Sequence, residues 1–528
     1  MTPSVVIQIY TVLAPLLFLF MRPKYAVLVV FYLGWLFLPN ISEAEALNLP
    51  LFPPLRKSVA PGYAVLMGML LFDFGKVMAF RFRTIDWLAV AFVGLPVISC
   101  FTNFEYFRFS PVRAIHGSLS LVLPNVMLYG VPYFAGRVYF SDGPGLLRLV
   151  KAHIVAGLVY VPFCLVEWRL TPQFHRWVYG YHATDFGMAM RLGGFRPRVF
   201  MWHGLMTGLF MCSTAIAATW LWVSGTAKKI AGVPIWAVAP GLIMIGILTR
   251  STGAIALMLM ALMLMGVIYL TKMRWLLLAM AMAAPLYITT RVVGWQGFEL
   301  LELAEKFNEE RALSLGGRMM NENVFIDKGL EKPLFGWAGW DRWHGRIDGS
   351  VSAQAARYEG HATVPDGWWV IAFGTTGFIG LGTLILYLTM PAILLVKRVP
   401  VRYWYGPAGA AAAIAVICAM LMTDSIFNKM DAHPYHMMVG AAVGTLAGFR
   451  MPSPAGQAAA RRRRPGEGRR DPQQRSSPDL DPHGPDTPQP GAPGATGYAH
   501  PHPTGGYGQV QDRGPELGPD RGPELGPA

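Results

Sequence analysis

The chain has 528 residues, of which 53% are hydrophobic and 14% are charged, and its mean hydropathy is +0.37. Such a composition cannot supply the polar surface of a soluble globular protein, so it predicts an integral membrane protein built from helices. The formal net charge is +14 at pH 7. A nucleic-acid partner is not expected, because no aromatic stacking platform accompanies the basic residues.

Apolar segments of the length needed to cross a bilayer, roughly 20 residues, recur along the first 450 residues. The first of them is expected to be retained as a span, since no basic residue precedes it and no small-residue cleavage site follows it. Hydropathy predicts an all-α bundle of about 12 to 13 spans. They lie near residues 4–21, 24–39, 62–80, 84–102, 117–139, 147–168, 199–223, 231–248, 253–271, 274–290, 368–396, 407–424 and 434–449.

The distribution of Lys and Arg predicts the orientation of these spans. If the spans alternate, most basic connections fall on one side, which the positive-inside rule assigns to the cytoplasm. The other side is then the outer, periplasmic face. It holds the segments 40–60, 103–116, 169–198, 249–252, 291–367 and 425–433.

The last segment, 451–528, is rich in Pro, Gly and Arg and carries the tandem repeat DRGPELGP. Such a composition cannot bury enough apolar surface to fold, so a disordered cytoplasmic tail is expected after the membrane domain 1–450. Its Arg461 to Arg464 cluster is suited to binding anionic membrane lipids. All four cysteines fall in apolar segments, which argues against disulfides and Cys-type metal sites.

Arginines on the predicted outer face run against the positive-inside bias, and a bound anion would explain them. They are Arg108, Arg113, Arg191, Arg196, Arg198, Arg250, Arg291 and Arg318. Most fall in three sequence pieces, RLGGFRPRVFMWHG at 191–204, TRSTGA at 249–254 and GGRMMNENVFIDKGLEKPLFGWAGWDRW at 316–343. A fourth piece, GHATVPDGWWVIAFGTTGFIGLG at 360–382, leads from the long outer loop into a span. The third piece predicts a helix from about Arg318 to Lys328, followed by a Pro and Gly turn.

In their order, these four pieces resemble the O-antigen ligase and O-antigen polymerase superfamily. Members show an Arg-bearing helix followed by a PLxGxG element, here Arg318 and PLFGWAG, and then a GxxG that starts the next span, here GTTGFIG. The resemblance covers roughly residues 60 to 450. Asp366 stands where many ligases have a His, and the nearest imidazole is His361.

The resemblance implies a glycosyltransferase that moves or polymerises a glycan from a polyprenyl-pyrophosphate donor onto a glycan or lipid acceptor. The reaction belongs to lipopolysaccharide or other surface polysaccharide biosynthesis, at the outer face of the bacterial inner membrane. Guanidinium groups can stabilise a departing pyrophosphate without a metal, so neither a metal nor another cofactor is expected. The arginines expected to bind the pyrophosphate are Arg191, Arg196, Arg198, Arg250 and Arg318. The alternative is that some of them pair with acids of the outer loop or reach lipid headgroups.

Two residues are candidates for the catalytic base that takes the proton of the acceptor hydroxyl, Asp366 and His361. An imidazole titrates near neutrality, whereas Asp366 would be an efficient base only if burial raised its pKa. Asp366 is also suited to capping a helix that starts at about Gly367.

Other features leave alternatives open. Five tryptophans, Trp337, Trp340, Trp343, Trp368 and Trp369, form either an aromatic belt at the membrane boundary or a stacking surface for sugars. His203 is expected to be a packing residue. The alternative function is a polytopic transporter or flippase of a lipid-linked saccharide. However, the chain has no hydropathy repeat and no matching pair of broken spans, which favours the enzyme.

Overall fold

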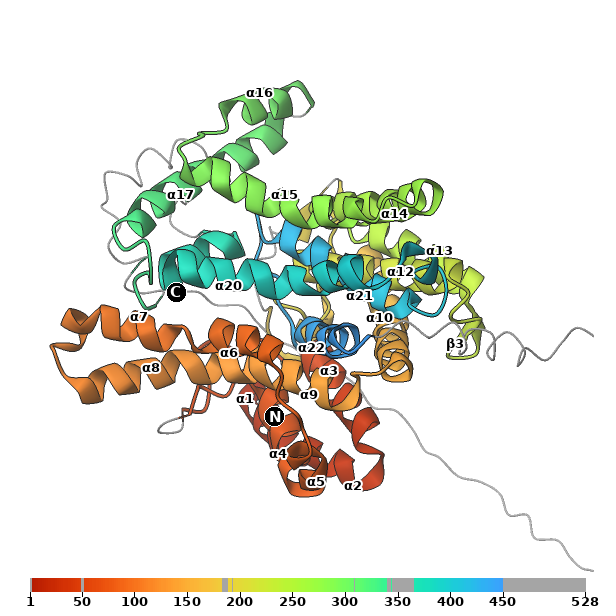
Figure 1. The fold of residues 1–528 in the computed structure, drawn as a ribbon, viewed down its shortest axis with the longest axis horizontal. Coiled ribbons are helices and arrows are strands. Elements are labelled where there is room, and N and C mark those ends of the chain that lie inside the picture. The colour runs from red at the N-terminus through yellow and green to blue at the C-terminus, as the bar shows by residue number, and fades with distance from the viewer. Residues whose placement is uncertain are drawn as a thin grey trace, which may run out of the picture. The chain divides into compact units, whose positions relative to one another are not determined.

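A computed structural model describes residues 2–48, 52–182, 189–191, 193–307, 309–339, 343 and 365–449. This part of the chain is a helical bundle with only two short β-hairpins, as the sequence predicts (Figure 1). The predicted disordered tail at 451–528 lies outside the described residues.

The helical elements of the first half are α1 (Pro3–Leu13), η1 (Ala14–Leu16), α2 (Leu17–Phe20), α3 (Pro23–Phe37), α4 (Ala60–Phe72), α5 (Phe74–Met78), η2 (Thr84–Asp86), α6 (Trp87–Gly94), α7 (Pro96–Thr102), η3 (Phe104–Phe107), α8 (Pro111–Asn125), the π-helical turn η4 (Val126–Gly130), α9 (Val131–Tyr139), α10 (Gly143–Leu170), α11 (Phe174–Tyr179) and α12 (Gly204–Val223). The second half contains α13 (Ile235–Leu248), α14 (Thr252–Thr271), α15 (Trp275–Val292), α16 (Phe298–Phe307), α17 (Glu309–Leu330), α20 (Trp368–Arg398), η6 (Val401–Tyr403), α21 (Gly409–Asp424) and α22 (His433–Ala447). Strand β1 (Met190–Arg191) pairs antiparallel with β2 (Gly194–Phe195), and β3 (Lys229–Ile230) pairs antiparallel with β4 (Val233–Pro234).

The chain is a multi-pass membrane protein. Among the described residues, seven helices are long and apolar enough to cross a membrane, or eight if α6 and α7, bent by 49° at Pro96, count as one span. Apolar helices also fall on the remaining predicted spans, but they are shorter. The four clearest have 13 to 16 residues, which at about 1.5 Å per residue cover less than the hydrocarbon thickness of roughly 30 Å.

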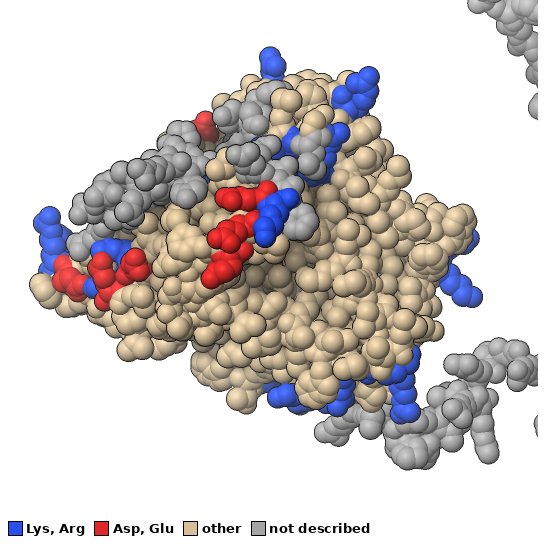
Figure 2. Space-filling model, turned by 90° about the horizontal axis from the view of Figure 1, so that it is seen from above, with Lys and Arg blue, Asp and Glu red and all other residues tan. Residues whose placement is uncertain are grey.

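The surface of the bundle agrees with this assignment. Figure 2 shows a face on which Lys, Arg, Asp and Glu gather at a few places and leave wide uncharged areas. Large apolar side chains are exposed on the spanning helices, with Leu270 of α14 and Leu286 of α15 at 78% and 67% exposure. In water such a surface would be unfavourable, whereas lipid tails cover it without penalty.

Hydrogen bonds join pairs of connections that the alternating topology assigns to the same face. Segments assigned to the outer face contact one another, through Asn40 N–H to His175 Nε2 (3.2 Å), Arg250 Nη1 to the Arg191 carbonyl (3.2 Å), Lys332 Nζ to Glu105 Oε1 (2.5 Å) and Trp368 N–H to the Asn428 carbonyl (3.2 Å). Segments assigned to the cytoplasmic face likewise contact one another, through Arg83 Nη1 to the Gly444 carbonyl (3.2 Å), Tyr139 Oη to Asp73 (2.8 Å) and Thr226 Oγ1 to the Gly406 carbonyl (3.2 Å).

Small residues let the central helices approach closely. Helix α22 packs against α9, where a Cβ added to Gly136 would lie 2.2 Å from the Met437 carbonyl oxygen. On the facing helix, a Cβ added to Gly440 would lie 2.1 Å from the Tyr133 carbonyl oxygen. Close backbone contact of this kind replaces the hydrophobic driving force that is absent between helices in lipid.

Helix α20 is broken at Gly377, whose φ of 67° and ψ of −168° are not helical. The segment 333–338, which we call the strap, bridges this break with four backbone hydrogen bonds. Before the break, the Gly374 and Thr375 carbonyls accept from strap N–H groups at 2.9 and 3.0 Å; after it, the Phe378 and Ile379 N–H groups donate to strap carbonyls at 2.7 and 3.3 Å. The PLFGWAG and GTTGFIG motifs are therefore two halves of one structure, in which the strap satisfies the groups that the break leaves unpaired.

Candidate functional site

Helix α17 is held on the bundle by a buried ion pair. Arg291, at the end of α15, lies 3.1 Å from Glu322 Oε2 through its Nε and donates to the Met319 carbonyl and to Asn323 Oδ1 at 2.8 and 2.7 Å. Tyr287 Oη also donates to Glu322, at 2.7 Å. Arg291 and Glu322 are 2% and 4% exposed. Burial raises the pKa of Glu322, and the charge of Arg291 opposes this effect.

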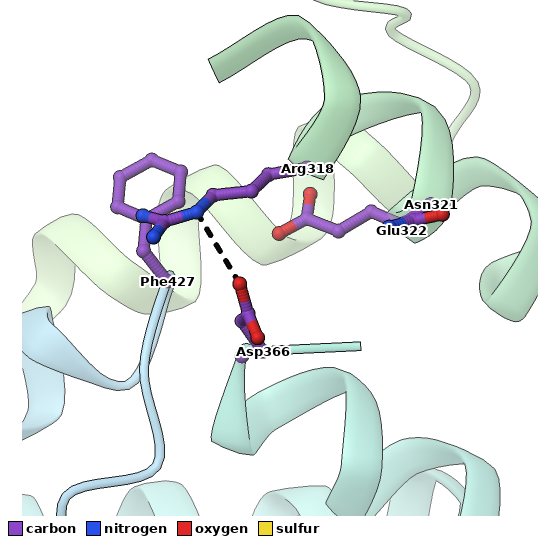
Figure 3. Close-up of a pocket in the computed structure, with 6 residues that line it drawn as sticks. Arg318, Asn321, Glu322, Asp366 and Phe427 are labelled. Carbon is purple, nitrogen blue, oxygen red and sulfur yellow. Dashed lines mark ion pairs between the residues drawn. The ribbon is translucent and has the colours of Figure 1, made fainter. Parts of the chain in front are cut away.

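One turn before Glu322, Arg318 lies on the same face of α17 and reaches the start of α20. Its Nε is 3.3 Å from Asp366 Oδ2, and the two side chains are 37% and 51% exposed. A hollow beside this ion pair is lined by Arg318, Asn321, Glu322, Asp366, Gly367 and Phe427. Figure 3 shows Arg318 and Glu322 projecting from α17 toward Asp366. The hollow therefore opens between a cation and two carboxylates of different burial.

The β1–β2 hairpin brings two more arginines together. Gly193 forms its turn with a φ of 68°, a conformation that glycine adopts without strain. Arg250, in the turn between α13 and α14, donates from Nη1 to the Arg191 carbonyl at 3.2 Å. Its guanidinium lies against Gly194, where an added Cβ would come within 2.0 Å of Nη1. The hairpin thus seats Arg250 beside Arg191.

Arg196 and Arg198 follow the hairpin and are each 5% exposed. Arg196 Nη2 donates to the Arg250 carbonyl at 3.4 Å, which ties the segment to the α13–α14 turn. The segment is also anchored by Glu167, near the end of α10, whose Oε2 accepts from the Arg198 and Val199 N–H groups at 2.8 and 2.7 Å. A carboxylate is thereby used to fix the backbone of an arginine-rich loop.

His203 lies beside this segment, because the Arg196 side chain packs on the next residue, Gly204, where an added Cβ would come within 2.2 Å of Arg196 Cδ. His203 is the N-cap of α12, and its Nδ1 accepts from the Leu205 N–H at 3.1 Å. Burial lowers the pKa of His203 to about 4, and the charges of Arg196, Arg198, Arg191 and Arg318 lower it further in the same direction. The charges of four of the predicted arginines, from three separate segments, therefore act on His203.

Hydrogen bonds join three of the five arginines predicted to bind pyrophosphate, since Arg250 donates to the Arg191 carbonyl and Arg196 donates to the Arg250 carbonyl. Arg198 follows Arg196 in the same segment, and the charge of Arg318 on α17 acts on His203. The structure also corrects several expectations. Arg291 is not available to an anion, because it is buried against Glu322. Arg108, which follows η3, and Arg113, in α8, are both exposed, so the expectation for these two stays a prediction. The helix predicted from Arg318 to Lys328 is longer and spans Glu309–Leu330.

Asp366 does not cap α20, because the N-cap is Gly367 and no side chain makes a capping hydrogen bond there. Its side chain is half exposed and paired with Arg318, so the burial that would favour Asp366 as a base is absent. The other candidate base, His361, lies outside the described residues.

The tryptophans form neither a membrane belt nor a sugar platform where the structure describes them. Trp337, Trp343, Trp368 and Trp369 are between 0% and 7% exposed, and Trp340 lies outside the described residues. Trp343 packs on Phe325 of α17 with ring centroids 4.6 Å apart, and Trp369 Nε1 donates to the Ile426 carbonyl. Trp343 of the outer loop thus packs between α17 and Gly374 of α20, whereas Trp369 ties the start of α20 to the α21–α22 connection.

Sequence reasoning missed two residues of the site. His203 was expected to pack on an apolar helix face, but it precedes the helix and faces the arginines. Asp424, at the end of α21, is 7% exposed, accepts from Asn428 Nδ2 at 2.9 Å and lies within electrostatic range of Arg318. An acidic residue at the end of an apolar helix was the available signal for Asp424.

The chain matches no model of a known protein family, and no curated protein shows significant similarity to it.

Proposed function

We propose that this protein is a membrane glycosyltransferase that moves or polymerises a glycan from a polyprenyl-pyrophosphate donor at the outer face of the bacterial inner membrane. The observation that carries the proposal is the set of contacts that joins Arg191, Arg196 and Arg250, with Arg198 in the same segment and the charge of Arg318 acting on the adjacent His203. Five guanidinium groups at one end of a membrane bundle suit a ligand with several negative charges next to lipid.

In the proposed reaction, the acceptor hydroxyl attacks the anomeric carbon of the donor glycan. The new glycosidic C–O bond forms as the bond to the pyrophosphate breaks, and the hydroxyl proton leaves to a base. The arginines stabilise the negative charge that grows on the departing pyrophosphate. Their preorganisation supports this role, since Glu167 fixes the Arg198 backbone and the Arg291–Glu322 pair fixes the helix that carries Arg318.

The orientation follows from the positive-inside rule. The cluster belongs to the connections assigned to the outer face, where polyprenyl-linked glycans are joined to surface polysaccharides, and the tail then lies in the cytoplasm. The catalytic base of the proposal remains either His361 or Asp366, and an acceptor proton could reach Asp366 only at the half-exposed mouth of the hollow.

The test is transfer by the purified protein in lipid nanodiscs, supplied with a polyprenyl-pyrophosphate-linked oligosaccharide and a glycan acceptor. Arg318→Ala and Arg250→Ala are expected to lower turnover by roughly 10² or more, by analogy with the loss of an oxyanion donor. Arg318→Lys should restore only part of the rate, because a point charge does not reproduce the planar fork. Arg402→Ala, at an exposed site at the other end of the bundle, is the matched control.

Turnover is also expected to persist in EDTA, since the arginines occupy the role of a divalent cation. Near-normal transfer by both Ala variants, together with loss of transfer in EDTA, would refute this mechanism. Profiling the surface polysaccharide of a gene deletion complemented with each variant then separates a polymerase, whose loss shortens chains, from a ligase, whose loss removes them.

A further inference from the structure

The tautomer of His203 is determined by its backbone contact. Nδ1 accepts a hydrogen bond from the Leu205 N–H, so Nδ1 carries no proton. A neutral imidazole has one ring proton, which must then lie on Nε2. No hydrogen bond to Nε2 is made within the described part of the chain, and the side chain is only partly buried. His203 thus has one nitrogen committed to the helix and one N–H group left for another partner.

Burial lowers the pKa of His203, and the positive charges around it act in the same direction, so the ring stays neutral. The Arg196 side chain packs on Gly204, next to His203, where an added Cβ would come within 2.2 Å of Arg196 Cδ. The charges that act on His203 belong to Arg191 of β1, to Arg196 and Arg198 in the segment before α12, and to Arg318 of α17. Asp366 pairs with Arg318, and Glu167 lies close to Arg198, so the carboxylates act on the arginines. Protonation would have to occur at Nδ1, where it would break the bond to Leu205 and add a sixth positive charge to the five arginines.

We propose that His203 is a substrate-binding residue of this cluster, whose neutral Nε2–H donates a hydrogen bond to a pyrophosphate oxygen of the donor. This inference rests on the proposed function and adds a residue and a role to it. A neutral donor complements the arginines, because its hydrogen bond orients the bound anion and it adds no positive charge that the arginines would repel. With Nδ1 committed and Nε2 protonated, His203 is not the catalytic base.

The two nitrogens can be tested separately by substitution. In His203→Asn, the amide oxygen takes the place of Nδ1 and Asn is a preferred N-cap, so the cap is kept and the distal donor is lost. In His203→Gln, the amide N–H₂ reaches the place of Nε2, so the donor is kept and the cap is lost. Each variant is assayed for thermal unfolding and for binding of geranyl pyrophosphate, a soluble prenyl pyrophosphate, in detergent.

The expected result is that the two properties separate. His203→Asn should unfold like the natural protein but bind geranyl pyrophosphate about tenfold more weakly, the effect of one lost hydrogen bond to a charged group. His203→Gln should bind within about threefold of the natural protein and unfold at a lower temperature. Binding that follows stability instead, weak for Gln and normal for Asn, would show that His203 only caps α12 and would overturn the inference.

Failure of the inference is distinguishable from failure of the proposed function. If the natural protein binds geranyl pyrophosphate and loses it in Arg318→Ala, but His203→Asn binds normally, the arginine site stands and the role of His203 is wrong. If the natural protein binds no prenyl pyrophosphate at millimolar concentration, the proposed function and the inference both fail.

Discussion

Arg318 Nε lies 3.3 Å from Asp366 Oδ2, and this ion pair joins α17 to the residue before the cap of α20. The same two helices are also joined by the strap, whose backbone bridges the break in α20. Helix α17 is therefore held at two places, by Arg291 at the end of α15 and by the pair of Arg318 with Asp366 at the start of α20. One consequence is that Arg318 and Asp366 should act as a unit.

A double-mutant cycle tests this coupling. Asp366→Asn is expected to lower glycan transfer, but to add little to the loss in Arg318→Ala, because residues that share one interaction are not additive. Transfer rates of the two single variants and the double variant provide the measurement. Losses that simply multiply would mean that Asp366 acts separately from Arg318, as an independent base would.

The break in α20 should not tolerate a side chain. Gly377→Ala places a Cβ 2.3 Å from the Leu334 backbone at a φ of 67°, so it must displace the strap. We expect a loss of more than about 2 kcal/mol in unfolding free energy. Gly382→Ala is the matched control on the same helix, since a Cβ there meets nothing within 4 Å, and it should be neutral or slightly stabilising. Equal melting temperatures for the two variants in detergent would contradict the claim that the strap stabilises the break in α20.

The contrast between Gly377 and Gly382 also shows where sequence reasoning succeeds. Apolar runs predict the helices because each must satisfy its own backbone in lipid, and the α13–α14 turn at Arg250 was expected from its position between two runs. Pairings between distant segments cannot be predicted from a local pattern in this way. Nothing in the local pattern states that Pro333 and Leu334 bond to residues of the GTTGFIG motif, or that Arg291 pairs with Glu322 rather than with an anion.

The candidate site was predictable only in part for the same reason. Arginines in connections that the positive-inside rule assigns to the outer face stand out in the sequence, and three of the five named for pyrophosphate, Arg191, Arg196 and Arg250, are joined by hydrogen bonds. The roles of Asp366 and the tryptophans depended on burial, which a motif does not record. Asp366 proved half exposed and the described tryptophans proved buried.

The Arg291–Glu322 pair supports the site without belonging to it. Arg291→Ala leaves the carboxylate of Glu322 buried without its cation and should cost about 3–5 kcal/mol of unfolding free energy. Replacing both residues, as Arg291→Met with Glu322→Leu, should recover much of that loss. Thermal unfolding of the single and double variants is the check, and a double variant less stable than Arg291→Ala would argue against the pair as the anchor.

The topology can be tested with single cysteines, because the four native cysteines are all buried. Glu43, whose side chain is 68% exposed, lies among the connections assigned to the outer face, and the exposed Thr271 lies at the end of α14 assigned to the cytoplasm. A membrane-impermeant thiol reagent should label Glu43→Cys in spheroplasts and reach Thr271→Cys only after lysis. The opposite pattern would place the arginine cluster in the cytoplasm and remove the basis for an outer-face donor.

Acid should lower the stability of the folded protein, because His203 is protonated more readily in the unfolded chain. The unfolded imidazole has a pKa near 6.5, whereas in the folded protein the pKa of His203 is lowered to about 4. Between these values the unfolded chain binds the proton and the folded protein does not. The contribution of His203 to the free energy of unfolding is therefore fully present above about pH 6.5 and is lost as the pH drops toward 4, by up to about 3 kcal/mol.

His203→Asn keeps the cap but cannot titrate, so its melting temperature should fall less between pH 7 and pH 4.5. The comparison removes the contribution of other buried groups such as His175, whose pKa is also lowered to about 4 by burial. Parallel melting curves for the two proteins over this range would show that folding does not lower the pKa of His203.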